Sequence, residues 1–141
     1  MSARRRLLRL FVAALVAVAS VGSGETTRGV PQRAEFSEQV KRGEATYLDE
    51  CARCHSETLG GTEFGPALVG HEFVRSWTGK NVGDMFVRVR DTMPIDGAGR
   101  LAAQQAVDVV AFILQENEVD VAGQPLAAEA AALNRIVIKA P

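Results

Sequence analysis

The sequence predicts one mostly α-helical domain, and three observations indicate it. Apolar residues recur at helical spacing from Phe36 to Cys51, and the segment from about Ala102 to Glu116 is apolar on several sides. No strand pattern longer than the run Ile136–Ile138 appears. The 141 residues contain no repeat, and 47% are hydrophobic and 23% charged, as is usual for a single globular domain. Only 6% are aromatic, so a core built from this chain alone would be modest.

Residues 1–23 have the pattern of a secretory signal peptide. A basic head, an apolar run and small residues follow one another: Arg4, Arg5, Arg6 and Arg9, then Leu10 to Val21, with cleavage expected after Ala19 or Ser23. A membrane-spanning helix needs about 20 apolar residues, so this run is short for an anchor. We therefore expect an exported, periplasmic protein that does not span a membrane after processing.

Export would change the charge of the protein. Without its first 23 residues the chain keeps 12 basic against 17 acidic side chains, a net charge near −5. This acidic balance argues against nucleic-acid binding and against binding to a membrane surface. Residues 24–35 contain Gly, Thr, Arg, Pro and Gln without any period, and we expect them to be a flexible lead-in.

The first predicted helix has a single apolar face. Its members recur every three or four residues: Phe36, Val40, Gly43, Tyr47 and Cys51. A glycine within a helix costs about 1 kcal/mol relative to alanine. The close approach of a second helix, which we expect to be the one near the C-terminus, would explain Gly43.

The two cysteines of the chain lie in the motif Cys51-Ala52-Arg53-Cys54-His55. A redox disulfide is usually found after a strand, whereas here the preceding residues predict a helix. A structural zinc site needs four ligands, and beyond this motif the chain has one further histidine, His71, and no cysteine. The remaining chemistry is covalent attachment of a haem through both thiols, with His55 binding the iron. Such a large flat cofactor would also complete the core.

Three residues are candidates for the sixth ligand of a haem iron. Met85 lies on the apolar stripe of a predicted helix that begins after Asn81, so we expect it in the core. Met93 precedes Pro94, which disfavours helical geometry at Met93 and predicts an extended loop that presents the thioether. His71 is expected to be structural. The sequence therefore favours Met93.

At this point the residues resemble the small class I c-type cytochromes. The resemblance covers most of residues 36–118 and includes Gly43, Tyr47, the Gly65–Gly70 segment with its G-P-x-L-x-G pattern, and Thr92-Met93-Pro94. It implies a cytochrome c fold, in which three or more helices wrap around one covalently bound haem c. The glycines between the haem motif and Trp77 are typical of such a wrapping loop.

The resemblance also assigns roles to single residues. It implies that the carbonyl of Pro66 accepts a hydrogen bond from His55, that Leu68 lines the haem pocket, and that Met93 is the axial methionine. Trp77 stands where the family often has a tryptophan that donates to a haem propionate, although a core aromatic would fit equally well. Leu101-Ala102 departs from the family, because it supplies no capping side chain before the last helix.

Residues 119–141 form a C-terminal extension. Gly123 and Pro125 indicate a turn, Ala127–Asn134 could form a short helix, and Ile136–Ile138 is an apolar strip that either packs on the body or binds a partner. The extension resembles those of small cytochromes that accept electrons from quinoprotein dehydrogenases.

These observations predict a function. We expect a one-electron carrier with His55 and Met93 as axial ligands, rather than an enzyme, since a filled sixth position disfavours substrate binding. Its partners would be redox proteins, with a quinoprotein dehydrogenase as a candidate donor and a cytochrome or oxidase as the acceptor. The alternatives are a haem-bearing subunit of a dehydrogenase or oxidase complex, and a haem sensor or enzyme with a displaceable sixth ligand.

Overall fold

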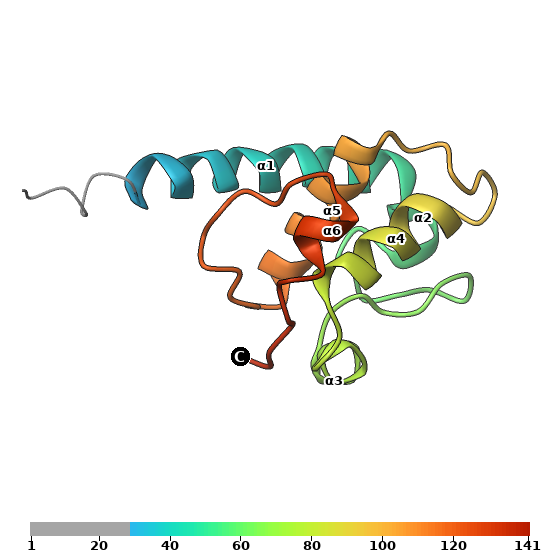
Figure 1. Ribbon diagram of the computed structural model, residues 1–141. Helices are drawn as coiled ribbons and strands as arrows, with labels where there is room; N and C mark the ends of the chain where they lie inside the picture. Colours follow the sequence, from blue (N-terminus) through green and yellow to red (C-terminus); the bar gives the residue numbers. More distant parts are fainter. Residues whose placement is uncertain (1–28) are drawn as a thin grey trace, which may run out of the picture.

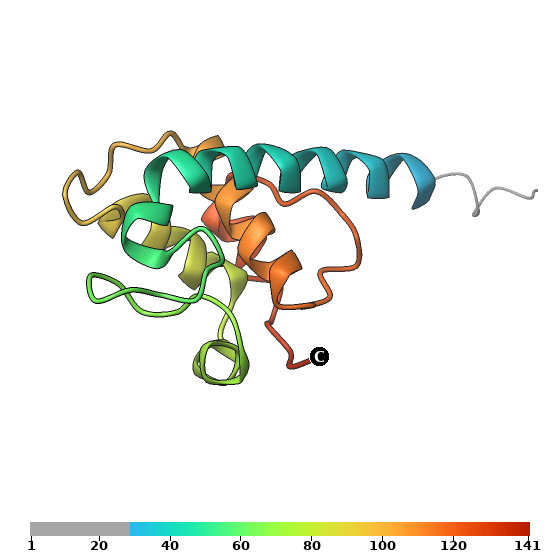
Figure 2. The same ribbon diagram turned by 180° about the vertical axis from the view of Figure 1, so that it is seen from behind.

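The computed structural model describes residues 29–141, and within them it contains six helices and no strand (Figure 1). The predicted signal peptide and the first part of the lead-in lie outside the described residues. The helices are α1 (Gly29–Glu50), α2 (Ala52–His55), α3 (His71–Trp77), α4 (Val82–Thr92), α5 (Ala103–Glu116) and α6 (Ala130–Leu133). In both views α1 runs along one edge of the molecule and α3 lies at the opposite edge (Figures 1 and 2). The mostly α-helical fold is therefore confirmed.

Helix α1 begins earlier than predicted. Residues 29–35 were expected to belong to a flexible lead-in, but they form the first two turns of α1. The side chains of residues 31–35 are exposed, so this part of the helix has no apolar face to reveal it in the sequence. Pro31 is compatible with a first turn, because a proline lacks only an N–H that has no helical partner there.

Helices α1 and α5 cross at Gly43, as its position in the sequence suggested. A Cβ atom at Gly43 would overlap the carbonyl oxygen of Asp108 and lie 3.0 Å from the Cβ of Phe112. One turn further along, the rings of Tyr47 and Phe112 pack with their centroids 5.4 Å apart. Glycine is thus required because the two backbones touch.

Helix α5 forms the centre of the core. Every residue from Ala106 to Leu114 is buried, including Asp108. Its start lacks a capping side chain at Ala102, as predicted, but the side chain of Gln105 accepts a hydrogen bond from the Ala102 N–H at 3.0 Å. One orphan donor of the first turn is therefore satisfied by a residue inside the helix.

Helix α4 agrees with its predicted bounds. The N–H of Asn81 donates to the Asp84 carboxylate at 3.1 Å, which closes the first turn. Val82, Met85 and Phe86 are buried, and the helix ends before Met93, which has the extended dihedrals φ −122° and ψ 152°. The prediction that Pro94 ends this helix is confirmed.

Helix α3 was not predicted. The stretch up to Trp77 was expected to be a wrapping loop, and residues 56–70 are irregular, but His71–Trp77 is helical. No residue of α3 is buried. Its half-buried side chains are Phe73, Val74 and Trp77, and a face of about two turns is too short to give a clear apolar period in the sequence.

The C-terminal extension packs on the body of the molecule. Leu133 and Ile138 are 1% exposed, and Val137 forms an isolated antiparallel bridge with Asn81. Ile138 of the apolar strip is therefore covered by the body of the molecule beside the start of α4, whereas Val137 is exposed. None of the described helices has the length and apolar character that crossing a membrane requires.

Candidate functional site

A cavity of about 870 Å³ opens between α2, α3, α4 and the loop that joins α2 to α3. All seven residues predicted for the site line it: Cys51, Cys54, His55, Pro66, Leu68, Trp77 and Met93. Met85, Val109 and Ile113 add apolar surface from the core side. The size and mostly apolar lining are those of a site for a large flat cofactor.

The two cysteines lie at the junction of α1 and α2. The N–H of Cys51 donates to the Tyr47 carbonyl at 2.8 Å, and the N–H groups of Cys54 and His55 donate to the Cys51 carbonyl at 3.1 and 3.0 Å. This tight turn brings both thiols and the imidazole to one side of the cavity. Both cysteines are free and half-buried. Burial, with a smaller contribution from the Glu50 carboxylate, raises the pKa of Cys51 to about 11.

His55 is oriented by the loop that follows it. Its Nδ1 lies 2.8 Å from the Pro66 carbonyl oxygen, so Nδ1 carries the proton and donates. This is the hydrogen bond that the resemblance implied. It leaves Nε2 as the nitrogen with a free lone pair, which is the form of imidazole that binds a metal.

Gly65 makes this orientation possible. A Cβ atom there would lie 2.8 Å from the Cys54 carbonyl oxygen and 3.0 Å from two atoms of the His55 ring, Cε1 and Nδ1. The loop backbone can approach the imidazole only because residue 65 has no side chain.

Tyr47 holds the other end of the same segment. Its hydroxyl donates to the Ser56 carbonyl at 2.6 Å, directly after His55. The side chain is fully buried, and this burial raises the pKa of Tyr47 to about 12. The phenol therefore stays protonated, and remains a donor, at any neutral pH.

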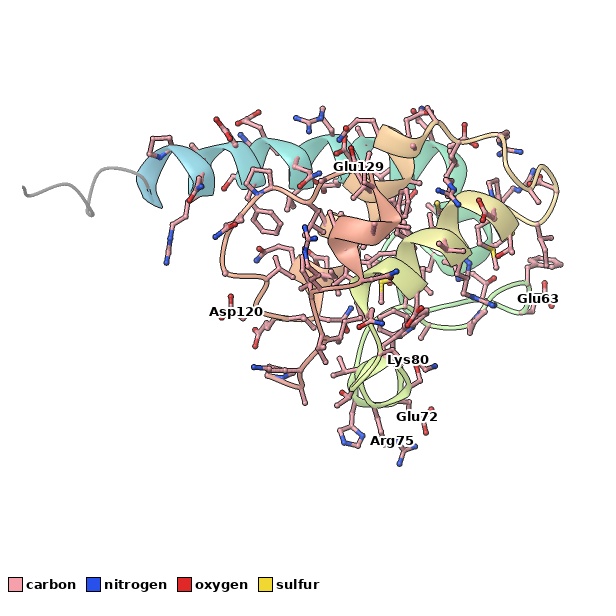
Figure 3. The ribbon with its side chains drawn as sticks, viewed as in Figure 1. Glu63, Glu72, Arg75, Lys80, Asp120 and Glu129 are labelled. Carbon is pink, nitrogen blue, oxygen red and sulfur yellow. The ribbon has the colours of Figure 1, made fainter. Side chains whose placement is uncertain are left out.

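The remaining predicted residues contribute in different ways. Met93 is half-buried on the extended residue after α4, whereas Met85 is 2% exposed within α4. His71 is exposed at the start of α3. Trp77 packs on Phe73, with ring centroids 6.3 Å apart, and the Lys80 ammonium lies 4.9 Å from the Trp77 ring centroid. Figure 3 shows Lys80 close to the first turn of α4.

Sequence reasoning missed Asn117. Its buried amide donates to the carbonyls of Leu68 and Ile113 at 2.9 and 2.8 Å, and its oxygen accepts from the Gly70 N–H at 3.1 Å. Asn117 thus ties the Leu68–Gly70 loop to the end of α5. A polar residue that ends an apolar helix was the available signal, but it is also typical of an exposed helix end.

An ion-pair network connects the cysteine segment to the methionine loop. Arg53 pairs with Asp96, and Arg100 pairs with both Asp96 and Glu50. The Arg53 guanidinium holds the pKa of Asp96 below its usual value. The four side chains are solvent-exposed or partly exposed, so their pairing orients the loop more than it stabilises the fold.

Comparison with known proteins agrees with this geometry. Residues 38–113 match the family model described as cytochrome c oxidase, cbb3-type, subunit III. This range includes the cysteine motif, Met93 and most of α5. A search of curated proteins found no match.

Among solved structures, the sulfane dehydrogenase SoxCD from Paracoccus pantotrophus has a similar fold. The TM-score is 0.51, and 19% of the aligned residues are identical. The match covers 70% of the present chain and 52% of that chain, so this protein spans about half the length of its structural relative. At this identity the likeness concerns the fold alone.

Proposed function

Because this chain belongs to the family of cbb3-type cytochrome c oxidase subunit III, a family of c-type cytochrome domains, we propose that it is a one-electron carrier whose haem iron has His55 and Met93 as axial ligands. One observation carries the proposal. His55, with Nδ1 engaged by Pro66 and Nε2 free, lines the same apolar cavity as the thioether of Met93. Imidazole and thioether together are the ligand pair of electron-transferring cytochromes c.

The residues of the cavity fit a covalently bound c-type haem. Cys51 and Cys54 supply the two thiols for the thioether bonds, and the cavity volume of about 870 Å³ is of the size that a large cofactor needs. When bound, the haem supplies a couple that gains and loses one electron at its iron.

The chain itself contributes orientation and exclusion of water. Pro66 fixes the tautomer and the plane of the His55 ring, and Gly65 allows that contact. Leu68 and the apolar side chains of α4 and α5 keep the lining dry. With a haem bound, the soft thioether of Met93 would favour the reduced metal and so raise the reduction potential.

The rival ligands are less suitable. Met85 is fixed in the core within α4, where it fills space between helices. His71 is exposed at the start of α3. Among the described residues, none forms a hydrogen bond with its ring that would orient it. Met93 alone combines an extended backbone with a half-buried side chain.

We further propose that the protein works in the periplasm with redox proteins as partners. The signal-like N-terminus supports export, and Phe64 and Ile95 support docking, because they line the cavity while their side chains are 75% and 84% exposed. The proposed donor is a quinoprotein dehydrogenase, and the proposed acceptor is a cytochrome or oxidase. N-terminal sequencing should place the mature end between Ser20 and Glu25, with the protein in the soluble periplasmic fraction; an intact Met1 in membranes would contradict export.

The variant Met93→Ala tests the ligand assignment. It should abolish the weak far-red absorption band of the thioether–ferric iron bond, lower the potential, and let the ferrous protein bind carbon monoxide. Optical spectra, potentiometry and carbon monoxide titration measure these changes.

Met85→Ala and His71→Ala are the controls. Met85→Ala should keep the band and lower the free energy of unfolding by about 2–5 kcal/mol, as for other buried methionines. His71→Ala should change neither property. Ready binding of carbon monoxide by the unmodified ferrous protein at neutral pH would favour a sensor or enzyme instead.

A further inference from the structure

The C-terminal extension, residues 119–141, uses its apolar side chains within the molecule. Five of its apolar residues are buried, with at most 7% of their surface exposed: Val119, Val121, Leu126, Leu133 and Ile138. Val137 is the large apolar residue of this extension that is exposed, at 46%. A segment whose apolar surface is already covered is a part of the fold and not a free docking arm.

The extension is first held by Gln39 of α1. The Gln39 side chain is 2% exposed, donates to the Leu126 carbonyl at 2.9 Å and accepts from the Leu126 N–H at 2.7 Å. The same amide donates to Asp108 at 3.0 Å. A buried side chain thus pairs with both backbone groups of Leu126, which fixes where the extension leaves the α1–α5 crossing.

The extension then reaches the beginning of α4. The Val82 N–H donates to the Ile136 carbonyl, the Ile138 N–H donates to the Lys80 carbonyl, and the Gly79 N–H donates to the Ile138 carbonyl, each at 2.9 Å. Val82 is the first residue of α4, so the extension supplies an acceptor that its own helix lacks. Both views show the C-terminal segment passing beside this end of α4 (Figures 1 and 2).

Helix α6 and the residue after it approach α4 one residue later. A Cβ atom at Gly83 would overlap Oδ1 of the exposed Asn134 side chain, directly after α6, and lie 3.1 Å from the Ala130 carbonyl oxygen. The absence of a side chain at position 83 therefore makes room for Asn134 and lets the α6 backbone lie close to α4.

We propose that residues 119–141 act as a clamp on the first turn of α4 and so position Met93 at its other end. This inference rests on the proposed role of Met93 as an iron ligand. The helix has 11 residues and a length of about 16 Å, carries Met85 and Val89 along the cavity, and ends at Thr92, directly before Met93. A rigid helix transmits a shift of its first turn to its last, so a released extension would loosen the thioether.

The variant Gly83→Ala tests the clamp without removing any apolar contact. Alanine favours the helix itself, but its methyl group would displace the Asn134 side chain and press on the Ala130 carbonyl oxygen of α6. We expect a weaker far-red thioether–iron band and an affinity of the ferric protein for added imidazole that rises about tenfold. The double variant Gly83→Ala/Asn134→Ala removes the overlap with Asn134 but keeps the contact with Ala130, so its values should lie between those of Gly83→Ala and the unmodified protein. Asn134→Ala alone should resemble the unmodified protein.

A second pair of variants keeps the test independent of Gly83. Ile138→Ala removes the buried side chain of the strip and should raise the affinity for imidazole in the same way. Val137→Ala, which changes the exposed neighbour, should leave the affinity for imidazole unchanged. Hydrogen exchange gives a readout separate from the haem. The amides of Val82, bonded to Ile136, and of Met93, bonded to Val89 at 3.3 Å, should both exchange faster in Ile138→Ala.

The outcomes separate the clamp from the ligand assignment. Two results for Ile138→Ala would overturn the clamp. One is faster hydrogen exchange at the Val82 amide with unchanged exchange at the Met93 amide. The other is faster exchange at Val82 with a thioether–iron band intensity and an imidazole affinity within twofold of those of the unmodified protein. Absence of the band in the unmodified protein would instead contradict Met93 ligation. In that case faster exchange at Met93 in Ile138→Ala would still support the clamp on α4, and unchanged exchange would refute it.

Discussion

Two neighbouring residues orient the His55 ring, one by a contact and one by the absence of a side chain. Pro66 contributes a carbonyl oxygen 2.8 Å from Nδ1, and Gly65 contributes the absence of a side chain beside the same ring. The first contact fixes the tautomer, and the second decides how closely the loop can approach. A metal ligand held on its far side by such a bond is more basic and better oriented than a free imidazole.

Gly65→Ala should therefore disturb His55 although it removes no contact. The new methyl group would meet the ring at 3.0 Å and the Cys54 carbonyl at 2.8 Å, so the Nδ1–Pro66 bond must lengthen or the ring must turn. Mutating a hydrogen-bond partner of a metal-binding histidine typically lowers the affinity for the metal about 10- to 100-fold. We expect a lower iron–histidine stretching frequency by resonance Raman spectroscopy of the ferrous protein.

Gly60→Ala is the matched control for this variant. A Cβ atom at Gly60 would approach only the Thr58 hydroxyl, at 3.3 Å, and Gly60 is exposed. The iron–histidine stretching frequency of the Gly60→Ala protein should equal that of the unmodified protein. An unchanged frequency in Gly65→Ala as well would mean that the loop gives way and does not orient the histidine.

Among the helices, the α1–α5 crossing organises the molecule. The two backbones touch at Gly43, and beside this contact the buried Asp108 carboxylate accepts hydrogen bonds from Gln39, Arg42 and Gln104. One side of the crossing is therefore apolar and close, and the other is polar and satisfied. The Arg42 guanidinium has a raised pKa, chiefly because it donates to Asp108.

Gly43→Ala has two opposing effects on stability, one through helix propensity and one through packing. Alanine would favour an isolated α1 by about 1 kcal/mol, but overpacking a close contact costs about 1–3 kcal/mol and more when the neighbour is backbone. Because the obstructing atom is the Asp108 carbonyl oxygen, we expect a net loss in the free energy of unfolding, measured in urea.

Ala45→Gly at an exposed position of the same helix calibrates this experiment. It should cost about 1 kcal/mol through propensity alone. A Gly43→Ala protein that is more stable than the unmodified one would show that the helices do not touch there in solution.

Taken whole, the molecule has two parts that depend on the cofactor to different degrees. Helices α1, α4 and α5 with the extension share a continuous core of buried apolar side chains. The α2–α3 loop and α3 surround the cavity and contact this core through Leu59 and a few half-buried side chains, such as Leu68 and Trp77. This second part therefore depends more on the haem for its packing than the first part does.

A Cys51→Ala/Cys54→Ala protein, which cannot attach the haem covalently, should lose structure in that second part first. We expect hydrogen exchange to accelerate at the amides of Leu68, bonded to Leu59, and of Gly70, bonded to Asn117, while the centre of α5 stays protected. The reason is that α5 keeps its apolar contacts with α1 and α4, although Val109 and Ile113 lose theirs with the haem, whereas the loop loses most of its packing surface. Equal loss of protection in both parts would contradict this division.

The features that depend on residues close in the chain could be predicted before the structure was known. The spacing of apolar residues predicted α4 and α5 almost to the residue, Pro94 predicted the end of α4, and the cysteine motif predicted the haem site. Gly43 indicated a helix crossing, because a glycine destabilises a helix unless its lack of a side chain allows a close contact. Each of these signals lies within a few residues of the feature that it predicts.

Which distant residues meet could be learned only from the folded molecule. Asn117 reaches Leu68, Gln39 reaches Leu126, and Ile136–Ile138 pairs with the start of α4; none of these partners is visible in the local pattern. The exposed turns of α1 and the short α3 were missed for a related reason, since a helix that is exposed, or only half-buried over two turns, gives no clear period. Periodicity reports whether a side chain is buried, but the identity of its partner depends on how complete helices and loops fit together in space.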